Sequence, residues 1–88
     1  MTRKEIATAE ERMTKLIRYI ENMDFTKDRS PEVARMELRR YDECNSQLKG
    51  MEQIIYAMGY APKYHFAEEK PNGESLSYYK ITRLGEYK

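Results

Sequence analysis

The sequence predicts a mostly helical α+β fold, in which a long antiparallel helical hairpin is followed by a C-terminal two-stranded β-hairpin. Two long segments have apolar residues at heptad spacing, and each begins with its own helix-start signal. Residues 63–84 instead alternate in polarity around an Asn-Gly turn, as paired strands do. The 88 residues are enough for one domain, 1–88.

The first helix is predicted at residues 3–23. Thr2 and Glu5 have the spacing of a capping box, in which each side chain accepts a hydrogen bond from a backbone N–H at the helix start. Apolar residues then follow in steps of three and four, which is the seam of a coiled coil. The seam consists of Ile6, Ala9, Met13, Leu16, Ile20 and Met23. Glu11 and Lys15 have the i,i+4 spacing of a surface ion pair.

A connector at 24–30 leads to a second helix at 31–58. Ser30 is a predicted N-cap, Pro31 suits the first helical position, and Gly59 suits a left-handed C-cap. The second seam has the same steps and consists of Tyr41, Cys44, Leu48, Met51, Ile55 and Met58. Matching seams joined by a short connector predict antiparallel packing.

The second helix is longer than the first by about two turns. We expect the extra length at its C-terminal end, beyond the start of the first helix, and we expect the β-hairpin to cover it. The apolar residues at that end are Ile54, Ile55, Tyr56 and Met58.

Pro71 determines the predicted register of the β-hairpin at about 63–84. Proline has no N–H for a ladder position, so a three-residue loop, 71–73, is favoured over a two-residue Asn-Gly turn. This register pairs Phe66 with Tyr78 and Tyr64 with Lys80. The face predicted to lie on the helices has Tyr64, Phe66, Leu76 and Tyr78, and the opposite face has His65, Tyr79 and Ile81.

Composition excludes several classes of protein. The net charge is +1, from 16 basic and 15 acidic residues, so bulk charge gives no support for nucleic-acid binding. A single cysteine suits a reducing compartment. The sequence has no apolar run of bilayer length and no signal peptide, so we expect a cytoplasmic protein without membrane contact.

No motif in the sequence indicates catalysis. His65 is the single histidine and has no convergent set of metal ligands, and Cys44 lies on an apolar seam where a thiol is inert. The sequence has no phosphate loop, nucleophile elbow or zinc spacing. We therefore expect no enzyme activity, no cofactor and no metal.

Binding to another macromolecule, most simply a protein, is the function that remains. Arginines cluster early in the second helix, among acidic residues that indicate either a solvated face or a partner-binding patch. Aromatic and arginine side chains are the usual anchors of an interface. The candidate partner-binding residues are Arg35, Arg39, Arg40, Tyr41, His65 and Tyr79.

Small size and the lack of catalytic motifs are also typical of phage or mobile-element accessory proteins. Such proteins often inhibit a host enzyme by occlusion, as anti-CRISPR proteins do with a CRISPR nuclease. Two helices alone shield both seams poorly, so a homodimer with a four-helix arrangement is a further expectation.

The alternative is a small DNA-binding transcriptional regulator. The segment YYKITRLGEY, 78–87, resembles the last wing strand of winged-helix regulators, which implies DNA binding. A winged helix would require the second helix to break near 42–46. A base-stacking surface with His65 and Tyr79, and with Lys63, Lys80 and Arg83 near phosphates, is the other nucleic-acid alternative.

Overall fold

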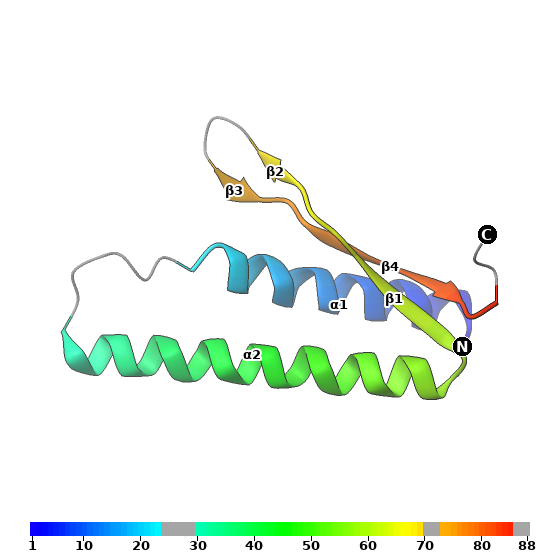
Figure 1. Cartoon of the computed structure of the whole chain (residues 1–88), viewed down its shortest axis with the longest axis horizontal. Helices are drawn as coiled ribbons and strands as arrows, with labels where there is room; N and C mark the ends of the chain where they lie inside the picture. The colour runs from blue at the N-terminus through cyan, green and yellow to red at the C-terminus, as the bar shows by residue number, and fades with distance from the viewer. Residues whose placement is uncertain (24–29, 70–72, 86–88) are drawn as a thin grey trace.

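The computed structural model describes residues 1–23, 30–69 and 73–85. Helix α1 spans Arg3–Glu21 and helix α2 spans Pro31–Ala57. The strands are β1 (Tyr60–His65), β2 (Glu68–Glu69), β3 (Glu74–Ser75) and β4 (Tyr78–Arg83). Figure 1 shows the helices side by side in one layer, the strands crossing over α1, and β2 and β3 projecting away from the helices. The predicted fold class is therefore confirmed.

The predicted helix starts are confirmed. Glu5 N donates to Thr2 Oγ1 at 3.1 Å and Thr2 N donates to Glu5 Oε1 at 2.8 Å, which completes the capping box. Ser30 Oγ accepts from the backbone N–H of Val33 at 3.3 Å. The surface ion pair is present, with 3.1 Å between Lys15 Nζ and Glu11 Oε1.

Helix α2 is continuous and ends where the sequence predicts. The helix runs through 42–50 without interruption. The break near 42–46 that a winged helix would require is therefore absent. Gly59 has a φ of 86°, in the left-handed region that favours glycine, and this conformation turns the chain directly into β1.

Polar side chains of α1 bind the outer edge of β4. Glu10 Oε2 accepts from Ile81 N at 2.9 Å, Thr14 Oγ1 accepts from Tyr79 N at 3.1 Å, and Arg18 Nε donates to Ser77 O at 2.9 Å. Successive residues of this set are four apart on the helix, a rise of about 6 Å along its axis. Their partners are two apart on the strand, a distance of about 6.6 Å along it. The spacings match, so α1 satisfies backbone groups that an edge strand would otherwise expose.

Pro62 interrupts the other edge of the two-stranded sheet. Pro62 pairs with Ile81, and Ile81 N is bonded to α1 instead of β1, so this is a non-hydrogen-bonded pair. The nitrogen of Pro62 therefore faces the open edge, where it has no proton to donate. Pro62 therefore disfavours the addition of a partner strand at this edge, because such binding relies on main-chain hydrogen bonds.

The register of the hairpin differs from the predicted register by one residue. Tyr64 pairs with Tyr79 and His65 pairs with Tyr78, and the same offset pairs Glu69 with Glu74. Four residues, 70–73, separate that last pair instead of three. The predicted turn at 71–73 lies mostly outside the described residues, although Gly73 has the expected positive φ of 69°.

A one-residue slip exchanges the two faces of a strand, and the predicted face assignment is wrong for this reason. Tyr79 and Ile81 are buried against the helices, whereas Phe66 and Tyr78 are exposed. The observed register buries Tyr79 and Ile81 while their N–H groups reach acceptors on α1, so packing and hydrogen bonding favour the same pairing.

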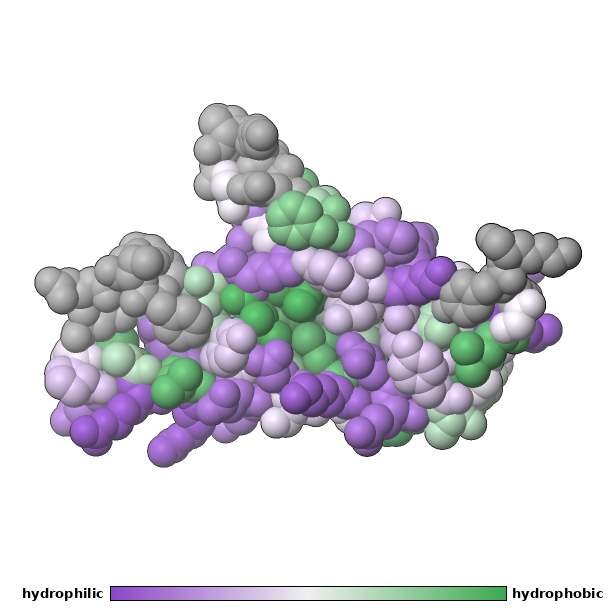
Figure 2. All heavy atoms as spheres, viewed as in Figure 1, coloured by the Kyte–Doolittle hydropathy of each residue, from purple (hydrophilic) through white to green (hydrophobic). Residues whose placement is uncertain are grey.

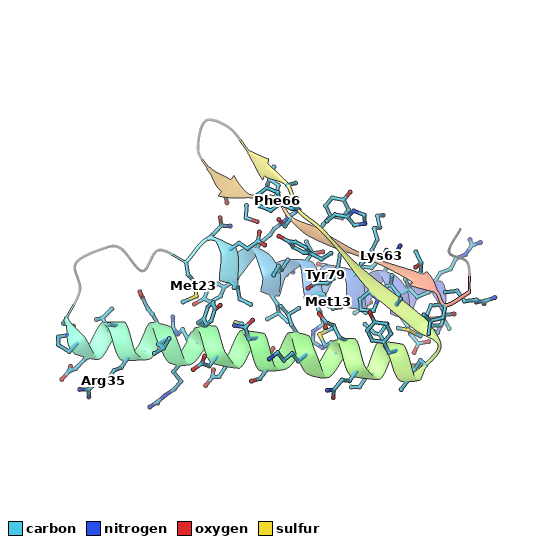
Figure 3. All side chains as sticks on the ribbon, viewed as in Figure 1. Met13, Met23, Arg35, Lys63, Phe66 and Tyr79 are labelled. Atoms are coloured by element: carbon cyan, nitrogen blue, oxygen red, sulfur yellow. The ribbon has the colours of Figure 1, made fainter. Side chains whose placement is uncertain are left out.

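The core lies where the strand pair meets both helices. Met13 is fully buried, and Figure 3 shows Met13 and Tyr79 between the helices and the strands. The buried cluster consists of Met13, Leu48, Ile55, Tyr60, Tyr79 and Ile81. Ile6, Ala9, Leu16, Ile20 and Met51 pack against it, so the core contains five of the six residues of the first predicted seam and three of the six of the second. Met58 is 48% exposed, and its predicted place in the seam is wrong.

The unpacked end of α2 is its N-terminal end, which corrects the predicted offset between the helices. Side chains along 31–40 are exposed except for the half-buried Glu37. At the other end, Met1 and Met51 line one hollow and Tyr60 Oη donates to Met1 O at 3.4 Å, so α2 ends beside the start of α1.

Candidate functional site

A furrow runs between the two helices on the side away from the strands. Thr14 of α1 bonds β4, and Leu16 lies two positions later, about 200° around the helix. Leu16 and Arg12 therefore point away from the strands. They line a series of three adjoining hollows of about 390, 430 and 390 Å³ between α1 and α2. We call this series the interhelical furrow.

The floor of the interhelical furrow is apolar. Met51 belongs to two of the hollows and packs against the buried core, while Ile54 beside it is 62% exposed. The less polar lining residues are Ala9, Leu16, Tyr19, Cys44, Met51 and Ile54. An exposed apolar floor of this kind marks an interaction site more often than a solvated groove.

The rim of the interhelical furrow has more cations than anions. The basic lining residues are Lys4, Arg12, Lys15 and Arg40, and the acidic ones are Glu5 and Glu43. Lys15 is paired with Glu11, so the other lining residues leave a local excess of one positive charge. The rim of the furrow is therefore more basic than acidic.

The unpacked end of α2 extends the same surface. Met36 precedes Arg40 by four residues, so the two share one side of the helix. Met36 is 56% exposed, and Val33 is also exposed. Figure 2 shows hydrophobic side chains at the surface over the first turns of α2. Helices gain most of their stability from packing, and most side chains in these first turns of α2 are exposed.

The residues predicted to bind a partner do not form one site. Arg35 and Arg39 are exposed on α2, and Figure 3 shows Arg35 pointing away from α1. Arg40 lines the interhelical furrow. Tyr41 is half-buried, and His65 lies on the far face of the strands, stacked on Tyr78.

Tyr79 is a core residue, which corrects its predicted place on the outer face. The side chain is 8% exposed, and its hydroxyl donates to Glu52 Oε1 at 3.4 Å. Burial and the nearby carboxylate of Glu52 raise the pKa of Tyr79 to about 12. A partner at the surface cannot reach this ring, because the one-residue change in register places it under the strands.

Sequence reasoning missed Ile54, Met36 and Tyr19. Each lies outside the predicted a/d seams, and each is exposed. Ile54 directly precedes the seam residue Ile55 and was assigned to the same buried end. The spacing of such residues predicts which side of a helix they lie on. Whether that side is exposed depends on where the strands pack.

A second polar group joins the end of α1 to the projecting strands. The carboxylate of Glu21 accepts from Ser75 Oγ at 2.5 Å, from Ser77 Oγ at 2.7 Å and from the hydroxyl of Tyr64. Asn22 Oδ1 accepts from Ser75 N at 2.6 Å. Partial burial acts to raise the pKa of Glu21, but these hydrogen bonds outweigh it and hold the pKa below the usual value of 4.5. The ionised form of Glu21 therefore holds the strands against the end of α1.

Acid should loosen this attachment. Because the pKa of Glu21 is lower in the folded state, its contribution to the free energy of unfolding is present above pH 4.5 and is lost as the pH falls through the lowered pKa. We expect Glu21→Gln to destabilise the protein by about 1 kcal/mol near pH 7, with the difference shrinking towards pH 3. Urea unfolding from pH 3 to 7 measures this, with the exposed Glu43→Gln as control. An unchanged difference across that range would contradict the role of the charge.

The described residues give no sign of a metal centre or of a membrane span. Among residues 1–23, 30–69 and 73–85, no group of three or more His, Cys, Asp and Glu side chains is placed to hold a metal ion. No helix in the same part of the chain is both long and apolar enough to cross a bilayer. Cys44 is half-buried at the wall of the furrow.

Comparisons of the chain with known protein families, with curated proteins and with solved structures found no match.

Proposed function

We propose that this protein is a non-enzymatic interaction module whose interhelical furrow binds a helical segment of a partner protein. The observation that supports the proposal best is the continuous furrow along α1 and α2, with an apolar floor and a cationic rim. An amphipathic helix laid in such a groove buries its apolar stripe, and acidic residues beside the stripe meet the rim.

The spacing of the furrow residues on α2 suits this mode of binding. Arg40, Gln47, Met51 and Ile54 line the furrow at intervals of seven, four and three residues, and Met36 precedes Arg40 by four. These are the intervals at which residues share one side of a helix. A partner helix parallel or antiparallel to α2 would meet them with its own i, i+3, i+4 and i+7 residues.

Homodimerisation through the furrow is less favoured by the charges. A second copy would bring a second cationic rim, so Arg12 and Arg40 would face basic residues of the other rim and the repulsion would oppose association. A partner of different sequence with acidic residues has no such cost. The homodimer and the inhibition of a host enzyme such as a CRISPR nuclease stay predictions, and so does DNA binding, although the winged-helix form of it lacks the helix break that it requires.

Ile54→Glu should abolish or strongly weaken capture of the partner. The substitution places a charge on the apolar floor, and we expect the affinity to fall at least tenfold, or about 1.4 kcal/mol. The partner is identified by affinity capture from the native host with mass spectrometry, and its affinity is then measured by titration calorimetry. The folded state of each variant is checked by circular dichroism.

Tyr56→Glu is the matched control. Tyr56 is 50% exposed and lies two positions after Ile54, about 200° around α2, so the same charge is placed outside the furrow. We expect this variant to bind as the wild type does. Equal loss in both variants, or full binding by Ile54→Glu, would show that the furrow is not the binding surface.

A further inference from the structure

The outer face of the strand pair is a second surface, on the side of the strands away from the helices. Along 74–81 every second side chain is buried, and the side chains between them are exposed. Two of the buried residues, Ser75 and Ser77, donate hydrogen bonds to the carboxylate of Glu21 on α1. The exposed residues therefore point away from the helices, because successive strand residues point to opposite sides. We call these exposed residues the outer column: Glu74, Leu76, Tyr78 and Lys80.

The outer column is acidic at one end and basic at the other, with apolar side chains between. Glu74 and Lys80 are six residues apart, about 20 Å along the strand. Between them, Leu76 is 36% exposed and Tyr78 is 38% exposed. Tyr78 also stacks on the ring of His65 from β1, with ring centroids 4.9 Å apart, which widens the apolar part of the surface. An apolar centre with charged residues around it is the usual composition of a protein interface.

The order of residues in the outer column is complementary to itself when the strand is reversed. Two copies stacked face to face can be related by a two-fold axis that lies at the level of Ser77 and crosses the strands at a right angle. This axis places Glu74 of each copy over Lys80 of the other, and Leu76 of each copy over Tyr78 of the other. An axis parallel to the strands would instead place like charges over one another, and their repulsion disfavours that arrangement.

The edges of the strand pair are less suited to a second copy than its outer face. The N–H groups of Tyr79 and Ile81 at the edge of β4 are bonded to side chains of α1. The edge of β1 is interrupted by Pro62, which has no proton to donate. Two copies are therefore better able to stack by their outer faces, as sheets do at a separation of about 10 Å, than to join strands into a wider sheet.

From this pattern of charge and burial we propose that the protein forms an antiparallel homodimer, in which the outer columns of two copies pack face to face. The face of a two-stranded sheet is small, so the dimer belongs with the weak and transient interfaces. The interhelical furrow lies on the other side of the helices and stays open in both copies. The dimer is therefore independent of the partner helix in the furrow, and it differs from a four-helix arrangement.

Exchange of the charges tests this arrangement. Glu74→Lys makes both ends of the outer column basic, and Lys80→Glu makes both ends acidic. Each variant alone should dimerise about tenfold or more weakly than the wild type, because both symmetric ion pairs become repulsive. An equal mixture of the two variants should form a heterodimer, because every basic end then meets an acidic end. Sedimentation velocity at roughly 5 to 500 µM protein measures the association of each sample.

Matched controls lie on α2. Asp42→Lys and Lys49→Glu make the same charge changes at exposed positions outside the outer column, and both should dimerise as the wild type does. Ile54→Glu should also keep the dimer, whereas its dissociation would place the contact in the furrow and overturn the proposal. Circular dichroism checks that each variant is folded. A wild type that stays monomeric over the whole range, or folded single variants whose mixture forms no heterodimer, would also overturn it.

Discussion

Tyr79→Ala is expected to lower the free energy of unfolding by about 3 to 5 kcal/mol, whereas Tyr78→Ala is expected to lower it by less than about 1 kcal/mol. The two residues are adjacent and chemically identical, but Tyr79 is 8% exposed within the core and Tyr78 is 38% exposed on the opposite face of the strands. Removing the buried ring leaves a cavity under the strands and leaves the half-buried Glu52 without the Tyr79 hydroxyl. Urea unfolding followed by circular dichroism measures both values.

This pair of variants tests the register of the hairpin directly. In the register predicted from Pro71, Tyr78 would be buried and Tyr79 exposed, so the two costs would be exchanged. Tyr79→Phe is the control for the hydroxyl, because it keeps the ring and removes one hydrogen bond of 3.4 Å to Glu52. We expect it to cost about 1 kcal/mol or less. Equal costs for Tyr78→Ala and Tyr79→Ala would contradict the pairing of Tyr64 with Tyr79.

The helices could be predicted from the sequence because their signals are local. The capping box of Thr2 and Glu5 and the N-cap Ser30 each act within one helical turn, and the structure contains both. Gly59 is similar, since one backbone conformation ends α2 and starts β1. Such features depend on neighbours in the chain and are independent of the packing of distant elements.

The register could not be predicted because its determinants are distant in sequence. Pro71 favours one loop length locally, but Thr14 and Glu10 of α1 bond Tyr79 and Ile81, more than sixty residues later. Nothing in the alternation of tyrosines shows which of two neighbours receives these contacts. The tertiary hydrogen bonds and the burial of Ile81 together outweigh the local preference of the turn.

The candidate surfaces depend on the same long-range choices. The interhelical furrow exists because the strands cover the opposite side of the helices, and the offset of the helices leaves Met36 outside the packed region. From the sequence, Arg40 was identified by residue type, and Ile54 was assigned to the covered end of α2. Residue types are therefore enough to suggest a binding protein. The positions of the candidate surfaces can be found only once the packing of helices and strands is known.

Met13→Ala is expected to lower the free energy of unfolding by about 2 to 5 kcal/mol. Met13 is fully buried, and it belongs to the cluster that joins both helices and the strands, with Leu48, Ile55 and Tyr79 among its members. Three methionine heavy atoms beyond Cβ are lost, and a cavity surrounded by three elements cannot close without moving one of them. A domain of this size has about 4 to 13 kcal/mol in total, so the melting temperature should fall by roughly 10 °C or more.

Met36→Ala is the matched control for this substitution. Met36 also lies on a helix but is 56% exposed, so it loses little packing, and alanine has the higher helix propensity. We expect a change within about 0.5 kcal/mol. Thermal unfolding of the two variants separates the contribution of the core from that of the methionine side chain itself. If Met13→Ala and Met36→Ala melted together, the strands would not be packed on α1 at Met13, and the furrow on the other side of the helices would lose its structural basis.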